Sequence, residues 1–335
     1  MHSLLPELKD AADVASTMRN RRPCKYEPTI IADFMSIQAP FVDVADLRAA
    51  IRRMQPGKTG GFGGITREHL LNLPDDILSL FLPFANSILD GTCPQEFKLG
   101  IIVPLSKDER RFRPVTLLGP LWKAVMTRVS DRLLDVLHKQ GVMDPAQYAF
   151  LRFGSTGPPI EIINEHAIAQ DREAHIVMLD ATSAYDCVVL HYLDVALRKI
   201  GAPPEFIDFI RKTAGGHTRI VSTGAGMTGE VDAFPLAGLA QGDPLSPALW
   251  VIVADMALTH ARKLSPSKEG PPGQTQVAGF KLMDLAGVPD CDGADEFSVP
   301  AAYQNAKAVG TSVLAYADDL CAIGGMRPCS SHSVW

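Results

Sequence analysis

The alternation of apolar and polar positions predicts a chain of mixed helices and strands. Apolar residues recur at helical spacing from Val44 to Met54, with Asp43 as the expected N-cap, and again from Leu121 to Lys139. Short apolar runs at Lys98–Leu105, Val115–Leu118 and His175–Leu179 are typical of strands. The charged loop Lys107–Pro114 between the first two predicts a hairpin with a basic tip. This mixture favours an α+β fold.

The remaining pattern is less regular. Further elements are expected as helices at Leu70–Asp90, from Asp186 to Ile200 and from Ser246 to about Lys263, and as strands at Arg219–Ser222 and Glu230–Phe234. Gly201-Ala202-Pro203-Pro204 is expected to end the second of these helices. Residues 1–40 show no clear period and are expected to form an N-terminal extension. Residues 265–308, rich in Pro, Gly and acids, are expected to form a loop insertion, and residues 326–335 an irregular tail.

Two short apolar runs enclose a pair of acids near the end of the sequence. Val313-Leu314-Ala315 leads into Tyr316-Ala317-Asp318-Asp319, and Leu320-Cys321-Ala322-Ile323 leads out. This pattern predicts a buried β-hairpin with its turn at the acids. Adjacent carboxylates in apolar surroundings are costly unless they are neutralised, and a divalent cation neutralises them. For these four residues alone, a solvated Asp-Asp turn is the alternative.

Composition excludes several classes of protein. The 335 residues are 46% hydrophobic and 21% charged, which suits one large or two ordinary globular domains. No apolar run reaches the length of a membrane span, and the first residues lack the apolar core of a signal peptide, so an intracellular protein without a membrane partner is expected. The six cysteines form no CxxC pair and the nine histidines no HExxH motif, which argues against a disulfide framework and a zinc site.

Charge is distributed unevenly along the chain. The net charge is −6, yet residues 98–139 contain nine Lys/Arg and four Asp/Glu, a local charge of +5 that leaves −11 for the remainder. A basic segment in an acidic chain fits one face that binds phosphates and another that binds metal ions. A solvated helix face would account for the basic segment equally well.

A third acid completes a candidate metal site. Asp180 ends the predicted strand at 175–179, whereas Asp318 and Asp319 lie at the predicted hairpin turn. If folding brings them together, three carboxylates suffice to hold two Mg²⁺ ions, with Mn²⁺ as the alternative, about 4 Å apart for nucleotidyl transfer.

Six motifs, in order along residues 40–325, give the chain a resemblance to reverse transcriptases of non-LTR (LINE-like) retrotransposons. The motifs are Gly57-Lys58…Gly61…Gly64-Ile65, Phe112-Arg113-Pro114-Val115-Thr116-Leu117-Leu118, Gln147…Phe150…Ser155-Thr156, Asp180…Ala184-Tyr185-Asp186, Gln241-Gly242-Asp243-Pro244-Leu245-Ser246-Pro247 and Tyr316-Ala317-Asp318-Asp319. The resemblance implies a right-hand polymerase with fingers at residues 41–170 and a palm at 171–325, in which helices back an antiparallel sheet. It further implies RNA-directed DNA synthesis from dNTPs on an RNA template with a DNA primer, and a nuclear location.

The resemblance also implies roles for single residues. Asp180, Asp318 and Asp319 are the expected catalytic metal ligands, and Lys107 and Arg113 are expected to bind the triphosphate. Tyr185 is expected to lie below the sugar and to exclude a 2′-hydroxyl. Further nucleotide contacts are expected from Ala181, Gln241 and Gly242, and template or primer contacts from Arg110, Arg111, Lys123, Arg152 and Tyr316. Each side chain also has a structural alternative, such as a core aromatic for Tyr185 or a solvated charge for Arg113.

Two further functional classes stay open at this point. The sequence ends shortly after the predicted hairpin, where the thumb of such polymerases follows, so we expect a thumbless fragment with little activity of its own. A non-catalytic retrotransposon relic or an RNA-binding module is therefore one alternative. Another metal-dependent palm enzyme, such as an RNA-templated RNA polymerase or a nucleotide cyclase, is the other.

Overall fold

A computed structural model describes the chain in segments. The described residues are 28–107, 111–144, 146–150, 157, 159–161, 174–181, 184–215, 217–223, 226–228, 231–232, 238–264, 280–284, 307–311, 313–316 and 319–325. For residues 174–180, 231–232, 260–264 and all strands beyond residue 264, only the backbone is described. Two compact units are present, one from the described parts of 24–136 and 183–250 and the other from those of 137–182 and 251–335.

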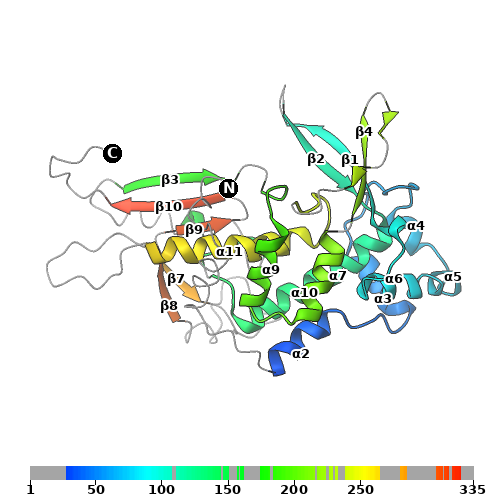
Figure 1. The fold of residues 1–335 in the computed structure, drawn as a ribbon, viewed down its shortest axis with the longest axis horizontal. Helices are drawn as coiled ribbons and strands as arrows, with labels where there is room; N and C mark the ends of the chain where they lie inside the picture. Colours follow the sequence, from blue (N-terminus) through cyan, green and yellow to red (C-terminus); the bar gives the residue numbers. More distant parts are fainter. Residues whose placement is uncertain are drawn as a thin grey trace. The chain divides into compact units, whose positions relative to one another are not determined.

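Helices and strands occur in separate runs along the chain, which is typical of an α+β fold (Figure 1). The helices are α2 (Pro28–Ile37), α3 (Val44–Arg53), α4 (Arg67–Leu71), α5 (Asp75–Ser79), α6 (Leu82–Leu89), the 3₁₀ turn η1 (Gln95–Lys98), α7 (Pro120–Gln140), α9 (Leu190–Lys199), α10 (Pro204–Ala214) and α11 (Ser246–Leu264). The strands are β1 (Leu99–Ser106), β2 (Phe112–Leu117), β3 (Ala174–Asp180), β4 (Thr218–Thr223), β5 (Gly226–Met227), β6 (Val231–Asp232), β7 (Phe280–Asp284), β8 (Lys307–Thr311), β9 (Val313–Tyr316) and β10 (Asp319–Gly325). Among the described residues, no helix is long and apolar enough to cross a bilayer.

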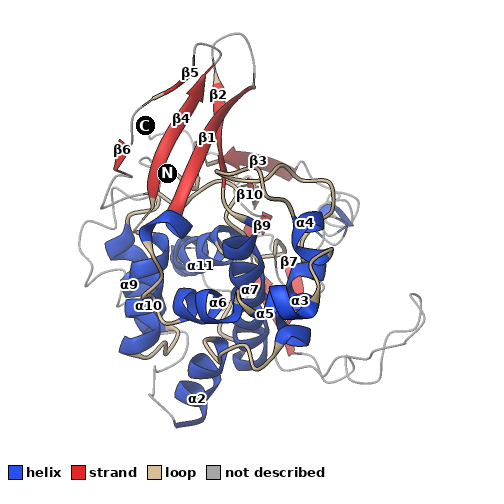
Figure 2. Cartoon of the chain, turned by 90° about the vertical axis from the view of Figure 1, so that its right-hand side faces the viewer, coloured by secondary structure: helices blue, strands red, loops and turns tan. Residues whose placement is uncertain are grey.

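The unit that contains α3 is built around a mixed sheet of order β2-β1-β4-β5, in which β6 also pairs with β4. β1 pairs antiparallel with β2, which confirms the predicted hairpin, and parallel with β4. In Figure 2 the strands β1, β2 and β4 extend together, away from the helices α6, α9 and α10 of the same unit. The free end of this hairpin is therefore presented to solvent.

The other unit contains a three-stranded antiparallel sheet of order β3-β10-β9. β9 and β10 form the hairpin predicted around the acid pair, and β10 also pairs with β3 along seven residues of each strand. A separate antiparallel pair joins β7 to β8.

Helix α7 carries much of the apolar core. The stripe predicted on it is buried throughout, with side chains at most 7% exposed at Trp122, Val125, Val129, Leu133 and Val136. Burying an apolar side chain of this size contributes about 1.5–3 kcal/mol each. The predicted start of α3 is also confirmed, because the side chain of Asp43 accepts a hydrogen bond from the backbone N–H of Asp46 at 2.8 Å.

Four expectations about the elements were wrong. The expected helix at 70–90 is divided into short helices, because Pro74 and Pro83 occupy positions next to helix starts and cannot continue a preceding helix. Helix α10 was not anticipated, since Pro203-Pro204 was interpreted only as a stop, whereas the two prolines precede and open the helix.

The other two corrections concern segments expected to be irregular. Residues 1–40 contain helix α2, in which Phe34 and Ile37 are fully buried. The ring centroid of Phe34 lies 5.3 Å from that of Phe206. The apolar residues Ile30, Phe34 and Ile37 recur at helical spacing in a stretch too short to stand out. Residues 265–308 contain strand β7, where Phe280 and Leu282 alternate with Lys281 in the two-residue period of a strand.

A glycine-rich loop from Gly57 to Gly64 packs directly on the segment between β2 and α7. A Cβ atom added at Gly61 would lie 2.6 Å from the carbonyl carbon of Leu118 and 2.7 Å from the backbone nitrogen of Gly119. At its start, the loop is held by Glu68, whose carboxylate accepts the N–H of Gly57 at 3.0 Å. This bond is the largest of several interactions that together lower the pKa of Glu68 to about 2. The loop therefore requires glycine at position 61 because backbone atoms occupy the space of a side chain.

Replacing Gly61 with alanine should destabilise the protein by about 1–3 kcal/mol, since the neighbouring backbone cannot move as a flexible side chain would. Gly119→Ala is the matched control, because a Cβ atom at Gly119 meets nothing within 4 Å, and a change within about 0.5 kcal/mol is expected. Urea unfolding followed by circular dichroism measures both variants. Equal midpoints for the two would contradict the close packing of this loop.

Candidate functional site

Pairing between β10 and β3 brings two of the three predicted acids together. Asp319 is the direct cross-strand partner of Asp180, and Tyr316 is the partner of Asp319 on the other side. Directly opposed residues on antiparallel strands have Cα atoms about 4.5–5.5 Å apart. The two acids therefore start from neighbouring backbone positions, although they come from distant parts of the sequence. Asp318 lies outside the described residues.

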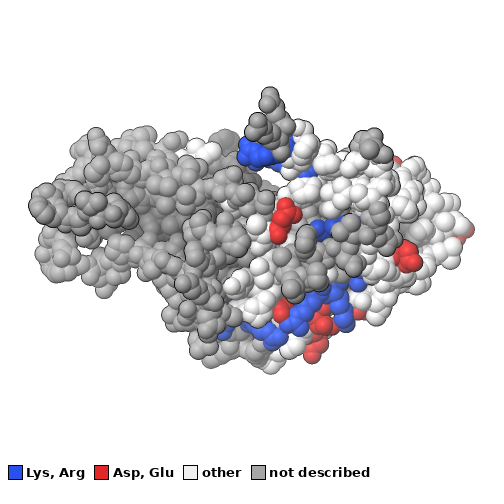
Figure 3. Space-filling view, turned by 45° about the horizontal axis from the view of Figure 1, so that its top comes forward, with Lys and Arg blue, Asp and Glu red and all other residues white. Residues whose placement is uncertain are grey.

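The two predicted triphosphate ligands lie at the free end of the β1–β2 hairpin. Arg113 is the cross-strand partner of Leu105, and the backbone N–H of Lys107 donates to the carbonyl of Arg111 at 2.8 Å to close the turn. Lys107, Arg111 and Arg113 are all exposed. Figure 3 shows basic side chains at this end of the hairpin. The arrangement presents cations to solvent where an anionic ligand can reach them.

Tyr185 lies in a turn that the backbone joins to the segment before Gln241. Its carbonyl accepts hydrogen bonds from the N–H of Val188 at 3.4 Å and of Leu239 at 2.8 Å, and the N–H of Gly238 donates to the carbonyl of Val188 at 2.7 Å. The ring of Tyr185 is half-buried, with its centroid 6.2 Å from that of Trp250. Tyr185 therefore has one side against a core tryptophan and keeps part of its surface accessible.

Gln241 and Gly242 lie directly on strand β2. The carbonyl of Gln241 accepts the N–H of Thr116 at 2.6 Å. Gly242 has a φ of +114°, and a Cβ atom there would lie 2.3 Å from the carbonyl oxygen of Thr116. Position 242 therefore needs glycine both for its backbone conformation and for the close approach to β2.

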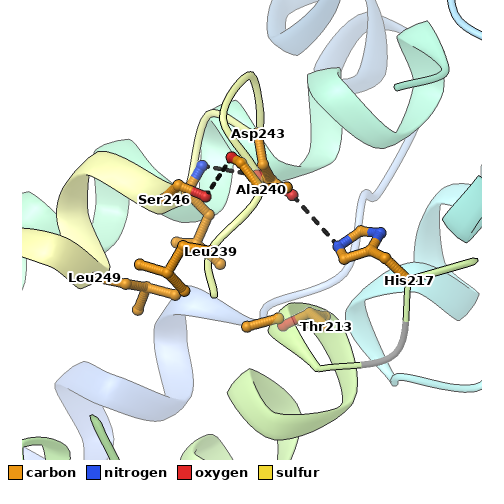
Figure 4. A pocket seen from close by; sticks show the side chains of 9 residues that line it. Thr213, His217, Leu239, Ala240, Asp243, Ser246 and Leu249 are labelled. Atoms are coloured by element: carbon orange, nitrogen blue, oxygen red, sulfur yellow. Dashed lines mark hydrogen bonds and ion pairs between the residues drawn. The ribbon is translucent and has the colours of Figure 1, made fainter. Parts of the chain in front are cut away.

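The next residue, Asp243, is a buried acid that the sequence interpretation did not assign a role. One carboxylate oxygen accepts the indole N–H of Trp122 at 2.9 Å, and the other accepts the backbone N–H of Leu245 at 2.8 Å. The Nε2 atom of His217 lies 3.8 Å from the first oxygen (Figure 4). The ring of His217 also meets that of Trp122 edge-on, with centroids 5.0 Å apart. Asp243 belongs to the QGDPLSP motif, so the motif was a signal for it, whereas nothing in the sequence marks His217.

Burial sets the protonation of the groups near Asp243. Desolvation lowers the pKa of His217, and Asp243 opposes this only in part because the pair is beyond hydrogen-bond distance. The Nδ1 atom of His217 lies 3.1 Å from the carbonyl oxygen of Lys98, which only accepts, so Nδ1 carries the proton of the neutral ring. Burial also lowers the pKa of Lys123 and of Arg219, and the charge of Asp243 opposes both shifts.

A small cavity lies beside Asp243. It is lined by Thr213, Ala214, His217, Leu239, Ala240, Asp243, Leu245, Ser246 and Leu249, several of which Figure 4 labels. The space open to water-sized atoms is about 10 Å³, room for about one water molecule. A pocket for an organic ligand typically measures hundreds of cubic ångströms, so this cavity belongs to the packing of the turn and does not bind a nucleotide.

The remaining predicted site residues fall into two groups. Ala181 is buried directly after β3, and Lys123 is half-buried on α7. Arg110 and Arg152 lie, like Asp318, outside the described residues. Within the described part of the chain, no group of three or more His, Cys, Asp or Glu side chains could hold a metal ion.

Comparison with known proteins gives consistent matches. The profile of the family "Reverse transcriptase (RNA-dependent DNA polymerase)" matches residues 105–327. The chain is 29% identical over 223 residues to the Retrovirus-related Pol polyprotein from type-2 retrotransposable element R2DM of Drosophila melanogaster, a match of 64% of this chain and 20% of that protein. It is 23% identical over 251 residues to the Retrovirus-related Pol polyprotein from type-1 retrotransposable element R2 of Popillia japonica, covering 71% of this chain and 33% of that protein.

A third relative is the Probable RNA-directed DNA polymerase from transposon BS of Drosophila melanogaster, 22% identical over 238 residues, with 68% of this chain and 26% of that protein covered. The chain thus spans only a fifth to a third of the length of the curated relatives it matches.

The buried neutral state of His217 predicts a pH dependence of stability. A histidine whose pKa is lowered on folding binds fewer protons in the folded than in the unfolded state, so the free energy of unfolding should fall as the pH drops below about 6.5. In His217→Gln, which keeps an N–H donor for Lys98, this slope should be shallower by up to about 1.4 kcal/mol per pH unit. Urea unfolding between pH 5 and pH 7.5 measures the slope, and identical slopes in both proteins would show that His217 is not buried in neutral form.

Proposed function

This chain belongs to the reverse transcriptase (RNA-dependent DNA polymerase) family, and from that premise we propose that it transfers a nucleotide from a dNTP to a primer 3′-hydroxyl on an RNA template, with Asp180, Asp318 and Asp319 as its catalytic acids. In this reaction the hydroxyl oxygen bonds to the α-phosphorus, the bond from that phosphorus to the β-phosphate bridge breaks, and pyrophosphate leaves. The sheet β3-β10-β9 would belong to the palm and the β1–β2 hairpin to the fingers.

The observation that carries the proposal is the register between β3 and β10. Asp180 and Asp319 are direct partners in it, and Asp318 is the neighbour of Asp319 in the sequence. Carboxylate oxygens are the ligands that Mg²⁺ prefers, and reverse transcriptases as a family use divalent metals. The acids present therefore fit a divalent cation. Two such ions, when bound, would lower the pKa of the attacking hydroxyl and neutralise charge on the phosphates.

The basic end of the β1–β2 hairpin fits the other part of the nucleotide. Lys107 and Arg113 would bind the triphosphate, because guanidinium and ammonium groups form strong charge-assisted hydrogen bonds with phosphate oxygens. Their exposure leaves both side chains accessible to a ligand.

The sugar and base would meet residues that the backbone already joins. Tyr185 would lie under the sugar, and Gln241 and Gly242 would line the pocket, with Ala181 next to the acids. The hydrogen bond between Tyr185 and Leu239 supports a common pocket, since it ties the Tyr185 turn to the segment that leads into Gln241.

Contacts with the template and primer would come from several basic residues and from Tyr316. Arg111 is exposed at the basic end of the hairpin and suits a phosphate of the template. Lys123 suits it less, because the residue is half-buried and its pKa is lowered by burial. Arg110, Arg152 and Tyr316 are proposed from the family resemblance alone.

Asp180→Asn and Asp319→Asn should each reduce incorporation of a single dNTP by at least about a hundredfold, since each removes a charged metal ligand while it keeps the side-chain size. Asp208→Asn is the control, an exposed acid paired with Lys212 on α10. Extension of a DNA primer on an RNA template with Mg²⁺ is measured in a single turnover, and Mn²⁺ binding is followed in parallel by electron paramagnetic resonance. Full activity in either variant would refute the assignment of the acids, and binding of primer-template without any incorporation by the unmodified chain would favour an RNA-binding module.

Tyr185→Ala should increase the use of ribonucleotides relative to deoxyribonucleotides by about tenfold or more, because the ring would no longer occupy the space of the 2′-hydroxyl. Tyr192→Ala on α9 is the matched control and should leave the ratio unchanged. The measurement is the ratio of kcat/KM for dNTP and NTP on the same primer-template. An unchanged ratio in Tyr185→Ala would show that Tyr185 does not select the sugar and is a core aromatic residue packed on Trp250.

A further inference from the structure

A buried cluster of Trp122, Asp243 and His217 lies next to Gln241 and Gly242, and the reaction proposed above assigns no role to it. The three residues are at most 7% exposed. A buried carboxylate is costly unless it accepts hydrogen bonds. Asp243 accepts them from the side chain of Trp122 and the backbone of Leu245, so the turn and α7 are both needed to keep it buried.

The cluster joins three parts of one unit. Trp122 lies in the first turn of α7, directly after β2. His217 precedes β4 and donates from Nδ1 to the carbonyl of Lys98, the residue before β1. Asp243 lies in the turn before α11. The same residues thus connect the base of the mixed sheet to the segment that carries Gln241.

Hydrogen bonds between residues close in sequence close the turn around Asp243. The carbonyl of Ala240 accepts the N–H of Asp243 at 3.1 Å and the hydroxyl of Ser246 at 2.8 Å, and the carbonyl of Asp243 accepts the N–H of Ser246 at 3.1 Å. At its outer side, the turn meets β2 through the Thr116–Gln241 bond of 2.6 Å. The turn that carries Asp243 therefore also fixes Gln241 and Gly242 against β2.

We propose that Trp122, Asp243 and His217 are positioning residues, which hold the turn 240–246 on strand β2 so that Gln241 and Gly242 are preorganised for an incoming nucleotide. The nucleotide part of this inference rests on the function proposed above. The part that concerns the turn does not, because it follows from the hydrogen bonds and the burial alone. Preorganisation of this kind lowers the cost of ordering a binding loop when the ligand arrives.

The first arm of the test measures the turn without any nucleotide. Trp122→Phe keeps an aromatic ring against His217 but removes the N–H that Asp243 accepts. Trp250→Phe is the matched control, since its buried Nε1–H has no hydrogen-bond partner within the described residues. Hydrogen exchange is measured at the amides of Thr116 and Leu245, with the amides of α3 as an internal reference.

Trp122→Phe should accelerate exchange at Thr116 and Leu245 by about tenfold, because loss of one charge-assisted bond lowers the cost of local opening by about 1.4 kcal/mol. Exchange in α3 should not change, and Trp250→Phe should change neither site. Equal acceleration in α3, or none at Thr116 and Leu245, would overturn the proposal. Should Trp122→Phe not fold, Asp243→Asn keeps the shape of the acid and is judged by the same amides.

The second arm measures nucleotide binding under the same conditions. In Trp122→Phe the KM for dNTP should rise by about tenfold while kcat changes less, and the exposed control Asp208→Asn should show no such split. If hydrogen exchange at Thr116 and Leu245 becomes faster while the KM for dNTP is unchanged, the claim that the turn is preorganised for a nucleotide is wrong. A wild-type chain that neither binds nor incorporates dNTPs would contradict the proposed function instead, and the exchange arm would then decide the role of the cluster by itself.

Discussion

The register of strand β10 against β3 is the constraint on which the proposed chemistry depends. Asp180 and Asp319 come from distant parts of the chain, and only this pairing makes them direct partners. Because side chains alternate between the faces of a strand, a shift of one residue would direct one acid to the opposite face of the sheet. β10 also pairs with β9 on its other side, so both edges of the strand fix the same register. The acid pair is thus positioned by backbone hydrogen bonds along the whole strand, which do not depend on the acids themselves.

In the unit that contains α3, the main constraint is instead the burial of charged side chains next to the turn 240–246. The charge of Asp243 acts on Lys123 and on Arg219, and the Nε2 atom of His217 lies 3.8 Å from the Asp243 carboxylate. In surroundings of low polarity such groups are stable only when they are paired or hydrogen-bonded, and a satisfied network specifies one arrangement strongly. The hydrogen bonds of Asp243 therefore favour one arrangement of the turn beside β2. The unit thus holds two kinds of basic residue, those half-buried near Asp243 and those exposed at the end of the β1–β2 hairpin.

Much of this organisation was predictable because local sequence signals agree with the tertiary contacts. The stripe on α7, the Asp43 cap of α3, the β1–β2 hairpin and the β9–β10 hairpin follow from apolar periodicity and turn chemistry. The errors occur where a local signal has two meanings. Prolines were interpreted as stops of helices, although Pro203 and Pro204 precede and open α10, and a short apolar period in α2 was too brief to recognise. The parallel pairing of β1 with β4 carries no local signal, since it joins strands that are separated by most of a domain.

For the candidate site, the sequence alone determined the residue types and their order, including the Tyr-Ala-Asp-Asp motif and the QGDPLSP motif, because these depend on chemistry that a few adjacent residues encode. The tertiary structure decided which acids are neighbours, which basic residues stay exposed, and that Asp243 is buried against Trp122 and His217. Those facts depend on strand register and on burial, and both arise from contacts between segments far apart in the chain. A motif identifies an aspartate, but only the tertiary structure determines whether that aspartate faces solvent or accepts a hydrogen bond from a tryptophan N–H.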